Sequence, residues 1–221
     1  MNSFDEMCEK ASKFPERDKR FSALEGYVDN LEEFINVTHD QTVLRLHSQI
    51  KNESDPVKEG EVSFILSQLE ESGKEDLSSM VCGAALVSVY FAYEASLLSW
   101  FEHLSKELES KKFAAFKNNR KNKKESFVRL AECYSSEILG FSIFSGAQGS
   151  EVIELLRKLR NSYVHNACSI SGIPDKYRNL NVFNISKSTW SISPAGVKYF
   201  YIQTYALYSH FCRLASEKMF T

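Results

Sequence analysis

Hydrophobic residues recur at helical spacing through most of the chain. In residues 17–50 they follow a 3-4-3-4 pattern that places one stripe on a helix: Phe21, Leu24, Val28, Leu31 and Ile35. Asp55-Pro56 is expected to break this helix, and a shorter amphipathic helix over 57–71 should follow, closed by Ser72-Gly73. From 77 to 104 nearly every face is apolar, which is typical of the central helix of a bundle.

The residue pattern in the second half of the chain predicts three more helices and a small hairpin. The first helix has apolar positions up to Ile138 and ends at Gly140, and the second carries Val152, Leu155, Leu156, Leu159 and Tyr163. Two short strands are expected in 182–185 and 189–192, and a last helix begins at Pro194. The predicted class is an all-α bundle with an N-terminal helical extension and a β-hairpin insertion near 180–193.

Composition supports this class, because only 9 Gly and 4 Pro occur in 221 residues and 43% of the residues are hydrophobic. The five cysteines are scattered without CxxC or Cys/His ligand spacing, so we expect neither a disulfide framework nor a metal site. No phosphate-binding or dinucleotide-binding glycine motif occurs, so we expect no cofactor. The N-terminus lacks the pattern of a signal peptide. The most apolar window, 80–101, includes Glu94 and predicts a buried core helix rather than a membrane span. We therefore expect a cytoplasmic protein without membrane contact.

Charge divides the chain into two parts. Residues 1–76 carry 9 Lys/Arg and 18 Asp/Glu, whereas 77–221 carry 18 and 11. We accordingly predict an acidic helical extension over 1–76 and a helical domain over 77–221. The basic part either meets an anionic partner or packs against the acidic segment. The segment 111–124 has seven Lys/Arg and no acid, so it is either a solvated loop or an RNA-binding arm that uses Lys117, Arg120, Lys121, Lys123 and Lys124.

The segment LLRKLRNSYVHNAC, residues 155–168, contains the candidate chemistry. Arg160, Asn161 and His165 lie within six residues at the end of an amphipathic helix. Histidine can take a proton from a 2′-OH or give one to a leaving 5′-oxygen. The permanent charge of arginine can stabilise a phosphorane, and Asn161 can orient either group. On an ideal helix Arg160 and His165 lie about 140° apart, so one phosphate is reached only through a distorted helix end or a cleft between subunits.

This segment resembles the HEPN superfamily, whose ribonuclease members carry an Arg, four to six residues and then a His, with Asn often following the Arg. The resemblance covers about 77–217 and includes the apolar helix with Tyr90 and Glu94. It implies a helical bundle that forms a homodimer with a composite active site and cuts RNA without a metal, often as a toxin or antiviral effector. Ala167 stands where one toxin group has a tyrosine modified by its antitoxin, so that mode of control is not expected, although another antitoxin or regulatory protein remains a candidate partner.

Glu94 is an ionisable group in an apolar helix and must be paired or protonated if it is buried. We expect it to support the site by pairing with an arginine of the motif helix or a tyrosine hydroxyl; the alternative is a partly exposed helix edge. The functional hypothesis is a metal-independent endoribonuclease with Arg160 and His165 as catalytic residues and Asn161 and Glu94 in support. The alternatives are a non-catalytic HEPN domain that binds a nucleotide, RNA or a protein, and an all-α interaction module without a nucleic-acid role.

Overall fold

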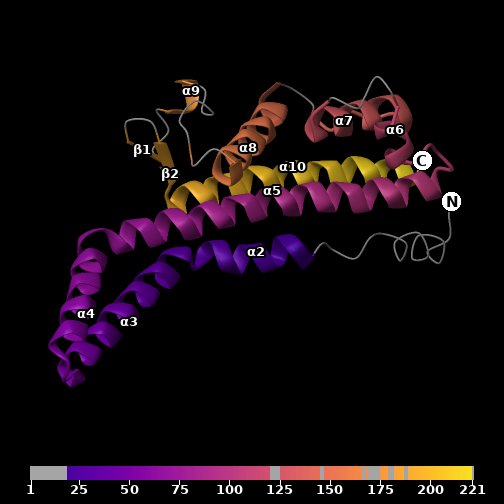
Figure 1. The fold of residues 1–221 in the computed structure, drawn as a ribbon. Coiled ribbons are helices and arrows are strands. Elements are labelled where there is room, and N and C mark those ends of the chain that lie inside the picture. The colour runs from indigo at the N-terminus through magenta and orange to yellow at the C-terminus, as the bar shows by residue number, and fades with distance from the viewer. Residues whose placement is uncertain are drawn as a thin grey trace.

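The computed structural model describes residues 19–119, 125–144, 147–165, 168, 175–178, 182–186 and 189–220. Two long helices, α5 (Lys74–Glu107) and α10 (Pro194–Phe220), run side by side through the body (Figure 1). α5 buries residues along most of its length, from Val81 to Ser105, so the prediction of a central helix is confirmed. Trp100 Nε1 donates to the hydroxyl of Tyr208 at 3.1 Å and ties the two helices together.

The N-terminal helices are α2 (Lys19–Asp29) and α3 (Leu31–Asn52). The single helical stripe predicted for 17–50 is therefore divided between two helices that meet at Asn30. α2 packs on α5 and α10. The ring of Phe21 stacks on Tyr208 with centroids 4.9 Å apart, and the Tyr201 hydroxyl donates to the Phe21 carbonyl at 3.1 Å. Phe21 therefore belongs to the same hydrophobic core as α5, and the boundary predicted at residue 76 falls inside that helix.

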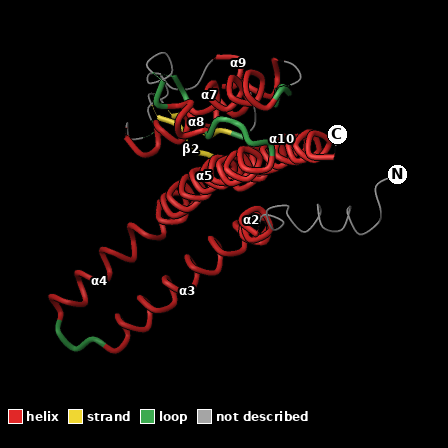
Figure 2. Tube along the Cα trace, turned by 90° about the vertical axis from the view of Figure 1, so that its right-hand side faces the viewer, coloured by secondary structure: helices red, strands yellow, loops and turns green. Residues whose placement is uncertain are grey.

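Beyond Asn30, α3 and α4 (Pro56–Gln68) leave the body together as a helical hairpin, which we call the arm (Figures 1 and 2). The break at Asp55-Pro56 is confirmed: the Asp55 carboxylate accepts from the Val57 amide at 3.0 Å, and Pro56 occupies the first helical turn.

The predicted helix end at Ser72-Gly73 is wrong. A π-helical turn, η1 (Leu69–Gly73), connects α4 directly to α5, and the chain bends there (Figure 1). Gly73 keeps right-handed helical angles, φ −61° and ψ −30°, and the Leu69 side chain fills the space beside its Cα. Glycine ends a helix when it turns left-handed, and here it does not.

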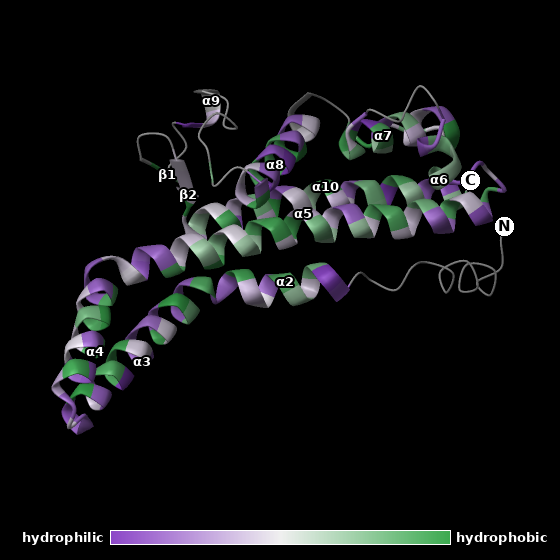
Figure 3. Cartoon of the chain, in the orientation of Figure 1, coloured by the Kyte–Doolittle hydropathy of each residue, from purple (hydrophilic) through white to green (hydrophobic). Residues whose placement is uncertain are grey.

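The continuous helical run Pro56–Glu107 is long and apolar enough to cross a membrane by length and composition. However, 61% of its most apolar window is buried inside the protein, as expected of a core helix. Figure 3 shows hydrophobic positions along α5 where α2, α8 and α10 lie beside it.

Shorter helices cover one side of α5 and α10. They are α6 (Phe113–Lys117), α7 (Phe127–Tyr134), η2 (Ser135–Leu139) and α8 (Ala147–His165). The predicted helix end at Gly140 is confirmed, because Gly140 is left-handed with φ 79°. Phe113 and Phe116, which interrupt the basic run, are buried, and both rings contact Tyr134. Both phenylalanines are therefore core residues.

The hairpin is also confirmed. Strands β1 (Phe183–Ser186) and β2 (Thr189–Ile192) pair antiparallel, with Phe183 opposite Ile192, and a short helix α9 (Asp175–Arg178) precedes them. The indole of Trp190 donates to Ser162 Oγ at 3.1 Å, and the Trp190 amide donates to the Cys168 carbonyl at 2.9 Å. The hairpin thus fixes the C-terminal end of α8. The predicted class, mostly helical with one small hairpin, is correct.

Candidate functional site

Arg160 lies where α8 crosses α5. Three buried residues hold α8 against the core: Leu155, Leu156 and Leu159. Arg160 follows them on the helix and is half-buried at the edge of the core. Its Nη1 donates to Asn161 Oδ1 at 2.7 Å, and its guanidinium carbon lies 4.9 Å from the centroid of the Phe91 ring, within cation–π range. The guanidinium is therefore oriented both by the neighbouring amide and by an aromatic face of α5.

The Nε atom of Arg160 is buried and has no hydrogen-bond partner among the described residues. Leaving a buried donor unsatisfied costs about 1–3 kcal/mol, more when the group is charged. An arginine in this position is therefore a local cost to the fold. Such local inconsistencies occur preferentially at functional sites.

Glu94 is half-buried on α5, one turn beyond Tyr90. Burial raises the pKa of the Glu94 carboxyl above its ordinary value, and the positive charges of Arg160 and Lys117 partly offset this rise. No ion pair or hydrogen bond joins Glu94 to Arg160 within the described part of the chain. The predicted partnership is thus an electrostatic interaction through space, not a salt bridge.

Tyr90 lies in the same electrostatic environment. Its burial raises the pKa of its hydroxyl strongly, the charge of Glu94 raises it further, and Arg157 and Arg160 oppose the shift. Tyr90, Glu94, Arg157 and Arg160 therefore form one coupled group at the α5–α8 contact, which we call the α5–α8 cluster.

Arg157 and Glu154 connect this cluster to α7. Arg157 Nε donates to Glu154 Oε2 at 2.8 Å, and Ser126 Oγ donates to Glu154 Oε1 at 2.5 Å. Ser126 also caps α7, because its hydroxyl accepts from the Arg129 amide at 3.3 Å. The sequence interpretation did not single out Arg157, although its i,i+3 spacing to Glu154 and to Arg160 was a usable signal. Phe91 was also missed, because its contact depends on how α5 and α8 cross.

Lys117 is the residue of the basic run 111–124 whose charge acts on the α5–α8 cluster. It is the last residue of α6, its side chain is exposed, and its charge lowers the pKa of Glu94. The other predicted RNA-binding residues, Arg120, Lys121, Lys123 and Lys124, lie outside the described residues.

His165 is exposed and is the last residue of α8. The helix is regular up to this residue, so the five-residue separation places Arg160 and His165 about 140° apart and about 7.5 Å along the axis. No hydrogen bond joins them among the residues that the structure places. Up to His165 the described part of α8 is not distorted, so one of the two ways to bring Arg160 and His165 together is not observed there.

The turn between Arg160 and His165 is anchored on α5. The Tyr163 hydroxyl donates to the Met80 carbonyl at 2.9 Å, and its ring lies directly over Gly83, where a Cβ atom would overlap the ring carbons. The Cys168 amide then donates to the Ser162 carbonyl at 3.2 Å beyond the helix end. These contacts fix the last turn of α8 against α5.

The described residues contain no group of three or more His, Cys, Asp or Glu side chains arranged to hold a metal ion. Comparisons with family models, with curated proteins and with solved structures found no match to this chain. The site itself combines an oriented arginine, a half-buried carboxyl group, basic side chains and an exposed histidine.

Proposed function

We propose that the protein is an endoribonuclease of the HEPN type that cleaves RNA by attack of a 2′-OH, without a metal, as a toxin or phage-defence effector. The observation that carries the proposal is the arrangement on α8, where an oriented guanidinium and an exposed imidazole lie within two helical turns of each other. The positive charges of Arg157 and Lys117 act on the same Tyr90 and Glu94 groups as Arg160 does, so this end of the α5–α8 contact carries several cations that could attract a phosphate group.

In the proposed reaction His165 accepts the proton of a 2′-OH, and the 2′-oxygen attacks the adjacent phosphorus. The bond from phosphorus to the 5′-oxygen breaks, and a protonated imidazole gives that oxygen its proton. Arg160 stabilises the additional negative charge on the phosphorane. The products are a 2′,3′-cyclic phosphate and a 5′-OH end.

A homodimer with a composite active site resolves the 140° separation, because Arg160 of one copy and His165 of another can then face one phosphate. Exposed apolar side chains on α5 and α8 support a contact through helices 77–108 and 150–166: Phe91 is 46% exposed, Leu98 38% and Val164 48%. The same separation favours the alternative function, a non-catalytic domain that binds RNA, a nucleotide or a protein, if the chain acts as a single copy.

Cleavage of total RNA in the presence of EDTA tests the proposal. Arg160→Ala and His165→Ala should each lower the rate about 10²–10⁴-fold and leave the far-UV circular dichroism spectrum unchanged. Matched controls are Arg213→Ala, whose side chain is exposed and paired with Glu217, and His47→Ala on the arm. Both controls should cleave normally, and expression of the wild type but not of His165→Ala should slow growth.

Two results would reject catalysis at this site: cleavage that survives both substitutions, or cleavage that requires Mg²⁺. RNA binding that depends on Arg160, without any cleavage, would instead support the non-catalytic domain.

A further inference from the structure

Two polar groups of the α5–α8 cluster have no hydrogen-bond partner among the described residues: the Tyr90 hydroxyl and the Glu94 carboxyl group. Tyr90 is only 4% exposed, and its hydroxyl faces the cluster, because the charges of Glu94 and Arg160 both act on it. Polar groups at such depth are usually paired within the protein or with an ordered molecule. Their positions therefore indicate a ligand that offers hydrogen-bond donors to the carboxyl group and an acceptor to the hydroxyl.

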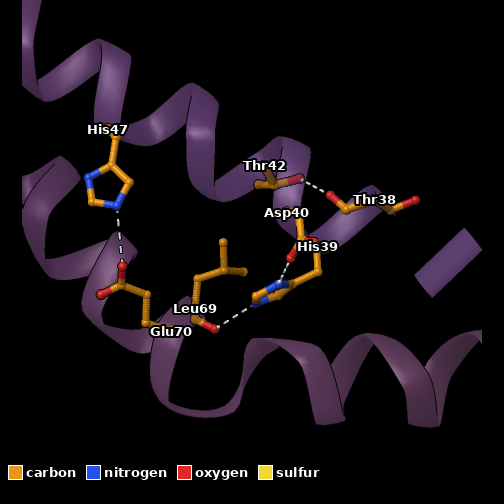
Figure 4. Close-up of polar contacts among 7 residues, drawn as sticks. All are labelled: Thr38, His39, Asp40, Thr42, His47, Leu69 and Glu70. Carbon is orange, nitrogen blue, oxygen red and sulfur yellow. Dashed lines mark hydrogen bonds and ion pairs between the residues drawn. The ribbon is translucent and has the colours of Figure 1, made fainter. Parts of the chain in front are cut away.

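The arm shows the ordinary arrangement, in which the fold itself supplies the partner (Figure 4). His47 Nε2 lies 3.3 Å from Glu70 Oε1, and His39 Nε2 lies 3.4 Å from the Leu69 carbonyl oxygen. Glu94 has no such neighbour in the described part of the chain, although it is half-buried and two cations act on it. A carboxylate beside a site that attracts phosphate also repels RNA, unless groups on the RNA donate hydrogen bonds to it. RNA that binds here must therefore supply donors to Glu94 from its bases.

Three side chains of α5 form one face next to Arg160. At 100° per residue Glu94 lies about 40° from Tyr90 and about 60° from Phe91 around the helix, so the three are neighbours on adjacent turns. Phe91 is 46% exposed, and the centroid of its ring lies 4.9 Å from the guanidinium carbon of Arg160. This set of side chains, which we call the α5 face, thus combines an exposed aromatic ring with an acceptor, Glu94, and a donor, Tyr90.

We propose that the α5 face binds an unpaired guanine base of the RNA, beside the phosphate group that Arg160 contacts. The proposal rests on the proposed function, because it takes RNA as the ligand. Unpaired bases stack on aromatic side chains and are recognised on their Watson–Crick edges. Here the base stacks on Phe91, its N1–H and N2–H groups donate to the Glu94 carboxylate, and the Tyr90 hydroxyl donates to O6.

Guanine is favoured over the other bases by the order of donors and acceptors on that edge. It presents two adjacent N–H donors beside a carbonyl acceptor, which matches a carboxylate beside a hydroxyl. Uracil presents a single N–H between two carbonyl oxygens, and adenine and cytosine place an acceptor nitrogen beside their amino group. In each of these three bases an acceptor would face the Glu94 carboxylate. A bidentate pair of this kind favours the matching base by about tenfold or more.

Binding of short single-stranded RNA tests the choice of base without depending on cleavage. The probes are UUGUU, UUAUU, UUCUU and UUUUU with 2′-O-methyl groups throughout, which block attack by the 2′-oxygen, and fluorescence anisotropy measures their affinity. The wild type should bind UUGUU about tenfold or more tightly than the other three. Inosine in place of the guanine lacks the 2-amino group and should lose much of that preference. Equal affinity for the four probes, or for guanine and inosine, would overturn the proposal.

Substitutions on α5 test which residues read the base. Glu94→Gln should remove the guanine preference, because its amide NH2 group faces one of the two guanine donors. Glu102→Gln is the matched control, at an exposed position of the same helix where the carboxylate lies 3.9 Å from the Lys106 ammonium, and it should keep the preference. Phe91→Leu should weaken the binding of all four probes alike, since stacking is tolerant of sequence. A guanine preference that survives Glu94→Gln, or that Glu102→Gln also loses, would overturn the proposal.

Unmodified UUGUU separates this proposal from the proposed function. Guanine preference without cleavage would reject the endoribonuclease and keep the base subsite, whereas cleavage without guanine preference would keep the endoribonuclease and overturn the subsite. Guanosine 5′-monophosphate distinguishes RNA from a free nucleotide as the source of the base. It should bind about tenfold more weakly than UUGUU, because it lacks the flanking phosphate groups that Arg157 and Lys117 attract. Equal affinity would overturn RNA as the ligand.

Discussion

Gly83 is the position where a single added methyl group should do most harm to the α5–α8 contact. A Cβ built on Gly83 would lie 2.6 Å from Tyr163 Cζ and would overlap Cε2, so the ring must move. Overpacking of this kind costs about 1–3 kcal/mol. Displacing the ring also breaks the hydrogen bond from its hydroxyl to Met80, worth about 1 kcal/mol. The higher helix propensity of alanine returns about 1 kcal/mol.

The net expectation for Gly83→Ala is a loss of about 1–3 kcal/mol, or about 2–12 °C in Tm for a chain of this size. Gly60→Ala is the control, since Gly60 lies in exposed helix α4 and a Cβ there would contact nothing within 4 Å. That change should raise Tm by about 2–4 °C. Thermal unfolding followed by circular dichroism measures both. If Gly83→Ala proves as stable as the wild type or more so, Tyr163 does not pack over Gly83 as described.

The remaining predictions concern charge. Because the folded protein holds the Glu94 proton more tightly than the unfolded chain, wild-type stability should fall as pH rises from the ordinary carboxyl value of 4.5 to the raised pKa. Glu94→Gln should remove that loss and be more stable at neutral pH, whereas Glu102→Gln, at an exposed position of the same helix, should behave like the wild type. Equal pH profiles for Glu94→Gln and wild type would contradict the burial argument. Replacing Lys121, Lys123 and Lys124 with Gln should flatten the salt dependence of RNA binding by about one unit of slope for each phosphate group that the variant no longer neutralises. Lys51→Gln and Lys58→Gln on the arm should leave that slope unchanged, and an unchanged slope in the triple variant would make 111–124 a solvated loop.

Local signals in the sequence were sufficient for most of the elements. The apolar positions of α5 predicted a central helix, Asp55-Pro56 predicted a helix break, and Gly140 predicted a helix end. Each of these signals depends on the propensities and hydrogen bonds of residues close together in the sequence. The helix end predicted at Ser72-Gly73 was wrong because it depends on tertiary packing rather than on local signals. Glycine permits a left-handed helix end but does not require one, and the packing of the chain kept Gly73 helical.

For the candidate site, the sequence alone determined that Arg160, Asn161 and His165 share one helix and that Arg160 and His165 point in different directions. Only the tertiary structure decided what surrounds them. Phe91, which contacts the Arg160 guanidinium, is far from it in the sequence, and Lys117, whose charge acts on Glu94, lies on another helix. Helical periodicity gives the direction of a side chain around its own axis, but it does not give the angle and offset at which two helices cross. Those depend on core packing, here the close approach of Tyr163 to Gly83, and they determine which charges meet.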